Sequence, residues 1–390
     1  MAPEPLLNPQ KSNRFRFPGT WGGILLLYLV SRIILLFFGV MSMQARGVQD
    51  HNYTHNLHLT DNTNPYLEVV YRWDAVWYVD IAREGYLAQR SNPNYAQWTE
   101  IPFATGFFPL VPLLIRTAHV LIPEWYLAGA LTGLLLGAMA LLLLTAEIRD
   151  RMGEEVETGV GLLFLVFPSA IFLSLPFAES LVLIGFVALA RGVRLRQWEW
   201  IVLGGLITAL AKPIGILLPL ALIFVKRDRW RESLIAGLAW MAGLLLVFFV
   251  FYTETGLPLA PFLRQNLSRG FPSGPWRGFV HFFVSEKYLF GWHGSWVDFI
   301  WALSFILLMT RASIARRFDR LTLVWGWILL LAPLSSTMVS YQRLSVAAFP
   351  VLVEIALLAR KPSIRAVLYV LFSGLLFLWV FRYATFQWVG

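Results

Sequence analysis

Long apolar runs recur throughout this chain of 390 residues and leave it little choice of fold. A helix needs about 17 to 25 apolar residues to cross a membrane, and open sheets cannot satisfy their backbone hydrogen bonds in lipid. Charged residues make up 14% of the chain, against roughly a quarter in soluble domains. We therefore predict an all-α polytopic membrane protein. The apolar runs, several of them short for a full span, cover residues 21–43, 125–146, 159–175, 234–252, 296–309, 321–334, 344–358 and 367–381.

The net charge of +9 comes from short Lys and Arg clusters between the apolar runs, and no single basic domain carries it. This distribution does not favour nucleic acid as a partner, and such clusters mark the cytoplasmic side of a membrane protein. Residues 1–20 are then cytoplasmic, and residues 44–102 and 254–294 form two large extracytoplasmic loops, with a short outer turn at 335–342. The clusters are Lys11/Arg14/Arg16, Arg191/Arg194/Arg196, Lys226/Arg227/Arg229/Arg231, Arg311/Arg316/Arg317/Arg320 and Arg360/Lys361/Arg365.

The order of these clusters requires one long apolar run to turn back on itself. Arg196 and Lys226 both belong inside, so the run between them must cross twice or dip and return. Pro213 is the natural break, because proline cannot continue a helix hydrogen-bond ladder. Lys212 is then expected at or near the outer surface.

The same argument applies to residues 159–190, which we expect to break at Pro176, with Glu179 on the outer side. Residues 107–122 form either a full span or a re-entrant piece. The hydrophobic-length rule then gives about ten to twelve transmembrane helices. Residues 1–390 read as a single membrane domain without the internal repeats that are common in transporters.

Carboxylates lie among aromatic residues in the segment 72–86, just outside a predicted membrane helix. The three- and four-residue spacing of similar side chains predicts an amphipathic helix that lies at the membrane interface. The first long outer loop is therefore expected to contain interfacial helices. Asp74 and Asp80 point in different directions on this helix, so a paired-carboxylate mechanism is not indicated. One face carries Trp73, Trp77, Asp80 and Glu84, and another carries Asp74, Tyr78 and Ile81.

Two interpretations of this segment are open. In the first, the Trp and Tyr residues form an aromatic belt at the membrane surface and the acids are merely solvated. In the second, Asp74 is a general base, because partial burial raises a carboxyl pKa toward the working pH and lets it take a proton from a hydroxyl.

The first outer loop also holds His51, His55 and His58, whose spacing is in part that of metal ligands. No carboxylate is closely interleaved with them, so a mobile polar loop explains them better. The chain has no Cys, which excludes disulfides, Cys-ligated zinc and thiol nucleophiles. We expect no cofactor and no metal ligands, with dependence on a divalent metal ion left open.

Ionisable residues beside apolar runs are further candidates for a functional site. Glu179 either caps the helix that follows it or faces a cavity. Lys212 and Arg343 are candidates to hold a phosphate group, although cations that reach from helix ends to the interface are common. Arg264 and Arg269 are candidates for the same role, but a solvated loop charge explains these two better.

Short motifs follow one another in a fixed order between Tyr71 and Pro350. They are Arg72-Trp73-Asp74-Ala75 with Ile81-Ala82 and Gly85-Tyr86, then residues 106–112, residues 167–174 leading to Glu179-Ser180, residues 209–215, residues 256–260, and Gln342-Arg343-Leu344 with Phe349-Pro350. Taken together, these motifs resemble the signature of the PIG-V family, which comprises the GPI mannosyltransferase 2 type and its prokaryotic relatives.

The resemblance implies a GT-C glycosyltransferase, a multi-helix membrane enzyme that takes a sugar from a polyprenyl phosphate. Its acceptor would be a hydroxyl of a glycolipid or of another molecule near the membrane. The compact chain further implies a prokaryotic plasma membrane, with the active site extracytoplasmic. The Trp-Asp motif makes Asp74 the catalytic residue. The residues expected to bind substrate or donor are Arg72, Trp73, Asp80, Glu179, Lys212 and Arg343.

Two positions depart from the family pattern. Trp77 stands where relatives often have His, and Lys212 stands where they have Arg. Lysine keeps the positive charge but loses the two-pronged grip of a guanidinium on phosphate. The resemblance therefore does not fix mannose as the sugar or a GPI precursor as the acceptor.

Two other classes of function remain as alternatives. A flippase or transporter of lipid-linked sugars would share a cavity and its cations, but it would show paired repeats and would not need Asp74 as a base. A non-catalytic membrane scaffold would not explain the long polar first loop.

Overall fold

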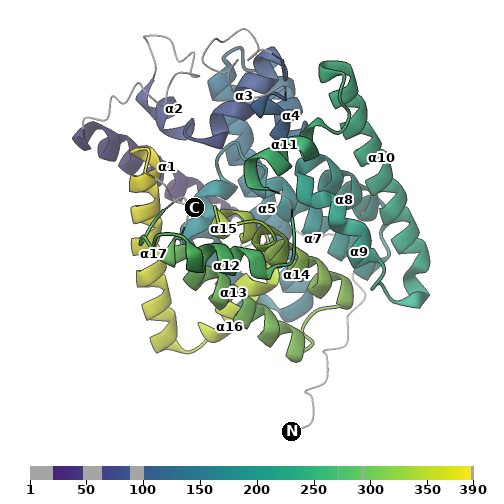
Figure 1. The fold of residues 1–390 in the computed structure, drawn as a ribbon. Coiled ribbons are helices and arrows are strands. Elements are labelled where there is room, and N and C mark those ends of the chain that lie inside the picture. The colour runs from purple at the N-terminus through teal and green to yellow at the C-terminus, as the bar shows by residue number, and fades with distance from the viewer. Residues whose placement is uncertain (1–20, 47–63, 88–100, 271, 292–293, 388–390) are drawn as a thin grey trace.

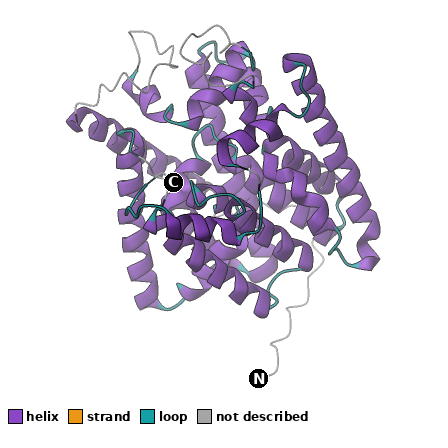
Figure 2. Ribbon diagram, in the orientation of Figure 1, coloured by secondary structure: helices purple, strands orange, loops and turns teal. Residues whose placement is uncertain are grey.

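The computed structural model describes residues 21–46, 64–87, 101–270, 272–291 and 294–387. Within these ranges every named element is a helix, as Figure 2 shows, which confirms the all-α prediction. The first helix, α1, and the last, α17, pack against each other in the bundle (Figure 1), although they lie at opposite ends of the sequence.

The helices differ widely in length, and short 3-10 turns (η) interrupt them. The α-helices are α1 (Trp21–Arg46), α2 (Pro65–Val70), α3 (Asp74–Glu84), α4 (Leu110–His119), α5 (Trp125–Met152), α6 (Glu154–Val166), α7 (Glu179–Leu195), α8 (Trp198–Ala211), α9 (Leu218–Leu222), α10 (Trp230–Thr255), α11 (Ala260–Arg269), α12 (Trp276–Val284), α13 (Trp296–Ile314), α14 (Arg320–Leu334), α15 (Tyr341–Ser345), α16 (Phe349–Leu358) and α17 (Pro362–Ala384). The 3-10 turns are η2 (Phe103–Gly106), η3 (Pro168–Leu173), η4 (Pro213–Leu217) and η5 (Arg227–Arg229).

Five of the described helices are long and apolar enough to cross a membrane, which supports an integral membrane protein. They are α1, α5, α10 together with η5, α13 and α17. Other apolar helices, such as α8, α14 and α16, are shorter. At 1.5 Å per residue the ten residues of α4 extend only about 15 Å, which is too short for a full span.

Proline breaks two of the apolar runs, and both breaks place charged residues at helix ends. The predicted break at Pro213 is confirmed, since α8 ends at Ala211 and η4 begins at the proline. The other break is wider than predicted: α6 already ends at Val166 and η3 begins at Pro168, because this earlier proline stops the helix as well. The earlier break leaves Glu179 at the start of α7, and the break at Pro213 leaves Lys212 at the end of α8.

Close packing of α5 against the broken segment depends on two glycines. A Cβ at Gly133 would overlap the backbone of Leu175, and one at Gly137 would overlap the carbonyl of Leu173. The absence of side chains lets this segment lie directly on α5. Since α7 begins a few residues later, these glycines set the position of Glu179.

A network of buried ion pairs closes the end of the bundle that is remote from Glu179. The carboxylate of Glu147 on α5 is fully buried and pairs with Arg151 of its own helix and with Arg191 and Arg194 of α7. The last two distances are 3.1 and 2.6 Å. Arg191 lies twelve residues beyond Glu179 on α7, about 18 Å along the helix. The basic cluster that contains Arg191 is therefore a packed part of the fold.

Replacing Glu147 by Ala should lower the free energy of unfolding by about 3 kcal/mol or more, because three guanidinium groups lose their shared carboxylate. Thermal unfolding of the detergent-solubilised protein, followed by tryptophan fluorescence, measures the change. Glu155→Gln is the matched control, since this exposed glutamate pairs with Arg360 at the surface and should cost less than about 1 kcal/mol. Equal shifts for the two variants would contradict the prediction.

Candidate active site

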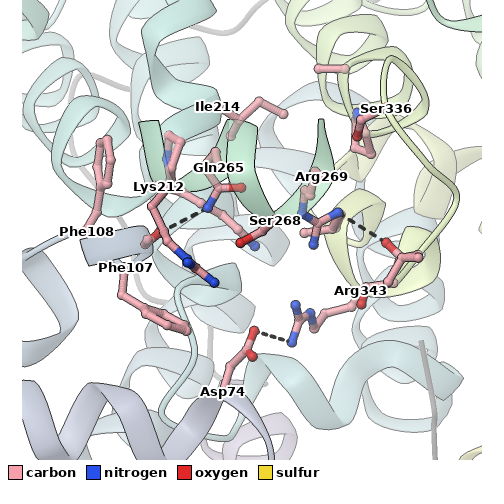
Figure 3. Close-up of a pocket in the computed structure, with 18 of the residues that line it drawn as sticks. Asp74, Phe107, Phe108, Lys212, Ile214, Gln265, Ser268, Arg269, Ser336 and Arg343 are labelled. Carbon is pink, nitrogen blue, oxygen red and sulfur yellow. Dashed lines mark hydrogen bonds and ion pairs between the residues drawn. The ribbon is translucent and has the colours of Figure 1, made fainter. Parts of the chain in front are cut away.

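A cavity of about 800 Å³ lies among the helix ends on the Glu179 side of the bundle. Its wall is built from the start of α3, from η2, the start of α7, η4, α11 and the segment between α14 and α15 (Figure 3). These pieces lie far apart in the sequence. Only the folded bundle brings their side chains together.

Asp74 reaches this cavity from the first turn of α3, and this helix confirms the helix predicted for the segment. Its side chain keeps 33% of its surface exposed, and its Oδ2 lies 2.7 Å from Nη1 of Arg343. The partial positive charge of a helix N-terminus adds to that of the guanidinium in stabilising the carboxylate. Figure 3 shows the two groups facing each other across the cavity floor.

Arg343 is the central cation of the site. Its side chain on α15 is 8% exposed and lies between two carboxylates, with Nε 3.4 Å from Oε1 of Glu179. The rings of Phe172 and Phe177 support its guanidinium at 5.8 and 5.3 Å. Although burial opposes the charge, Asp74 and Glu179 raise the pKa of Arg343 above its usual value. The group is therefore a permanent cation with a fixed direction.

Glu179 and Lys212 form the second ion pair of the site, with Nζ 2.6 Å from Oε1. Glu179 is 3% exposed at the start of α7, and Lys212 follows the last residue of α8. The lysine is extended, which is the conformation that a following proline imposes. Because Glu179 also contacts Arg343, one chain of charges runs from Asp74 through Arg343 and Glu179 to Lys212.

Two further arginines reach the cavity from α11, although the sequence favoured solvated loop charges for both. Arg264 is 7% exposed and lies over the ring of Phe103 at 4.6 Å. Arg269 donates to the carbonyl oxygen of Val339 at 3.3 Å. Burial lowers the pKa of Arg269 to about 10, and the nearby Arg343 contributes to this shift.

Amphipathic spacing on α11 is the signal that could have identified these arginines. Arg264 and Ser268 are four residues apart and line the cavity, as do Gln265 and Arg269. Leu263 and Leu267, which directly precede Arg264 and Ser268 in the sequence, are exposed. This pattern, at helical spacing, predicts one polar and one apolar face.

The cavity wall carries more positive than negative charge. Among the described lining residues, four basic side chains stand against the two acidic side chains Asp74 and Glu179. Arg269 has no carboxylate within ion-pairing distance among the residues that the structure describes, and it faces Arg343 in Figure 3. A cavity with an excess of cations and a partly unmatched guanidinium favours an anionic ligand.

Arg72 and Asp80 do not line this cavity, although the sequence suggested both as binding residues. Arg72 is fully buried against Glu68 at 2.9 Å and over the ring of Phe386 at 4.0 Å. Asp80 lies on the face of α3 that points away from Asp74, and burial, with Glu84 nearby, raises its pKa to about 7. The predicted separation of Asp80 from Asp74 is confirmed, but the predicted grouping of Trp73 with Asp80 is wrong, because Trp73 precedes the helix and lines the cavity with Asp74.

Trp73, also predicted to bind substrate, does line the cavity, beside Asp74. Trp77 packs against Phe103 at 4.8 Å and Phe107 at 6.0 Å between ring centroids. Among the described residues, no three His, Asp or Glu side chains gather as they would around a metal ion. The histidines at positions 51, 55 and 58 lie outside the described residues.

Comparison with solved structures shows the fold. The protein is similar to ArnT from Cupriavidus metallidurans bound to undecaprenyl phosphate, with a TM-score of 0.52 and 17% identity over 89% of this chain and 62% of that one. The apo state of the same enzyme gives a TM-score of 0.51 and 16% identity over 88% and 61%. The chain thus spans less than two thirds of the length of ArnT, whose polytopic bundle it resembles.

Comparison of sequences shows the family. No curated protein matches the chain. The family described as Mannosyltransferase (PIG-V) matches residues 23–265, which include Asp74, Glu179, Lys212 and Arg264. This match covers more than half of the chain and agrees with the motifs seen in the sequence. The chain belongs to the PIG-V family of mannosyltransferases.

Proposed function

We propose that this protein transfers a mannosyl group from a polyprenyl-phosphate donor to the hydroxyl of a glycolipid or another membrane-proximal acceptor, with inversion, on the extracytoplasmic side. One observation carries the proposal: the carboxylate of Asp74 and the guanidinium of Arg343 meet at 2.7 Å in the wall of a cation-rich cavity. A base for the acceptor and a cation for the leaving group thus stand side by side.

The donor phosphate binds between Arg343 and Arg269 in this proposal, with Lys212 nearby. Arg343 and Arg269 face each other in Figure 3, and both are poorly solvated. A phosphate between two guanidinium groups forms charge-assisted hydrogen bonds with each of them. Related support comes from ArnT, whose solved structure contains bound undecaprenyl phosphate.

The apolar part of the cavity suits the isoprenoid chain of such a donor. Ile214, Ile216 and Leu217 of η4 line it, and Ile216 also has 37% of its surface exposed at the outside of the bundle. Leu267 of α11 combines the same two properties, with 55% exposed. A lipid chain therefore has an apolar way into the cavity from the surrounding membrane, while its phosphate stays at the charged end.

Asp74 removes the proton from the acceptor hydroxyl as the acceptor oxygen bonds to the anomeric carbon of the donor. The bond from that carbon to the phosphate oxygen breaks at the same time, and its electron pair leaves with the phosphate. Arg343 and Arg269 stabilise the negative charge that the phosphate gains. One nucleophilic displacement of this kind inverts the anomeric configuration.

The distribution of charge supports the extracytoplasmic location. Arg191 and Arg194 lie at the end of the bundle opposite to Glu179, and basic clusters beside membrane helices favour the cytoplasmic side. The cavity, which contains Glu179, is then at the outer side.

Asp74→Asn should lower kcat by about 100-fold or more, because the amide cannot accept the hydroxyl proton. Purified protein is incubated with polyprenyl-phosphate mannose and candidate acceptors, and the mannosylated product is measured. Asp80→Asn, on the other face of α3, is the matched control and should keep the wild-type rate. Unchanged transfer by the Asp74 variant would contradict its role as base, and movement of donor across vesicles without transfer would favour a flippase.

Arg269→Gln should raise the KM for the donor by about tenfold or more, which corresponds to the loss of one charge-assisted hydrogen bond. Initial rates at varied donor concentration give this constant. Lys287→Gln removes an exposed cation of the same outer loop and serves as control. A donor KM that is equal in wild type and in Arg269→Gln would exclude this guanidinium from the phosphate site.

Transfer should continue in EDTA, because the cations of the protein already stabilise the leaving phosphate in the place where other enzymes use a metal ion. The same product assay, run with and without the chelator, measures this. Loss of activity in EDTA and its recovery with Mg²⁺ or Mn²⁺ would show that the reaction needs a divalent ion.

A further inference from the structure

Tyr383, near the end of the last helix, forms hydrogen bonds to the chain just before Asp74. Its hydroxyl is 2.9 Å from the carbonyl oxygen of Val70 and 2.9 Å from that of Arg72, and it accepts the Arg72 N–H at 3.4 Å. The side chain is 1% exposed, so water does not compete for these contacts. One hydroxyl thus ties α17 to a segment more than 300 residues away.

The segment that Tyr383 holds has an unusual backbone. Trp73 adopts φ 56° and ψ −129°, a left-handed conformation that is rare for residues other than glycine. Such a conformation persists only where the surroundings enforce it. Asp74 follows directly as the first residue of α3, so the backbone at Trp73 decides where the Asp74 carboxylate points.

The ring of Tyr383 packs against the aromatic residues that support Arg343, the ion-pair partner of Asp74. Its centroid lies 6.2 Å from that of Phe172 and 6.5 Å from that of Phe177. These two rings lie under the guanidinium of Arg343. The hydroxyl of Tyr383 therefore contacts the chain that carries Asp74, while its ring contacts the aromatic floor below Arg343.

We propose that Tyr383 is a positioning residue for transfer, which holds the chain at Val70–Arg72 so that Asp74 points at Arg343 and into the cavity. The proposal rests on the proposed function of Asp74 as base. It gives the hydroxyl and the ring separate roles: the hydroxyl fixes Asp74, and the ring supports Arg343. A substitution that removes only the hydroxyl should therefore affect the base and leave the donor site in place.

Tyr383→Phe is the substitution that separates these roles, since it keeps the ring and deletes one oxygen. It should lower kcat between about tenfold and hundredfold, because a carboxylate displaced by about 1 Å loses a large part of its effect. The KM for polyprenyl-phosphate mannose should stay within about twofold of wild type, because no donor contact is lost. A smaller folded fraction would also lower the apparent kcat at constant KM, so the melting temperature of the variant must stay close to that of wild type.

Tyr28→Phe is the matched control. Tyr28 is also fully buried, and its hydroxyl donates to a backbone carbonyl, that of Leu134, at 2.9 Å. This pair lies between α1 and α5 and does not line the cavity. Both variants should show similar melting temperatures, whereas only Tyr383→Phe should lose kcat.

Hydrogen exchange gives a readout that does not depend on activity. In Tyr383→Phe, peptides that cover residues 70–78 should take up deuterium faster than in wild type, and peptides from α5 and α7 should be unchanged. If the wild type transfers no sugar, the proposed function fails, while the exchange data still decide whether Tyr383 holds this segment.

Three results would overturn the inference. They are a wild-type kcat for Tyr383→Phe, equal loss of kcat in Tyr28→Phe, and unchanged deuterium uptake over residues 70–78. A parallel rise in donor KM and fall in melting temperature would also count against it, because those changes indicate a role in folding alone.

Discussion

A charged group can remain inside a membrane bundle only where another charge or a polar helix end compensates it. The fold meets this condition by interrupting helices. Proline breaks place Glu179 at the start of α7 and Lys212 at the end of α8, and the first turn of α3 supplies Asp74. Arg343 then lies between the two carboxylates at 2.7 and 3.4 Å. The site exists because several helix ends meet at one place in the bundle.

Much of this site could be predicted from the sequence, for a physical reason. Charged residues are so rare in apolar segments that those present are functional candidates by default. Asp74, Glu179, Lys212 and Arg343 come from four distant segments, and the structure joins them in one chain of ion pairs. The helical period of residues 73–86 also predicts that Asp74 and Asp80 lie on different faces of α3. The all-helical bundle follows from hydropathy alone.

Other parts depend on packing that local sequence does not encode. Arg72 stands next to the Trp-Asp motif and looks like a binding residue, but its side chain turns to Glu68 and Phe386. Arg269 looks like a solvated loop charge, but α11 lies across the cavity and turns it inward. Tyr383 looks like one more aromatic residue at a membrane interface. The break before α7 is wider than predicted, because two prolines are available and the earlier one already ends the helix.

The surplus of cations in the cavity has a consequence for the catalytic cycle. A sugar linked to polyprenyl phosphate is a phosphodiester with one negative charge, whereas the released lipid is a monoester whose second proton has a pKa near 6. At neutral pH the charge of the released lipid therefore approaches two negative charges. This balances the excess of the four basic over the two acidic side chains in the cavity wall more fully than the donor does. Under the proposed function the cavity holds its product more tightly than its donor. Departure of the spent lipid into the membrane, and not the displacement itself, would then limit turnover.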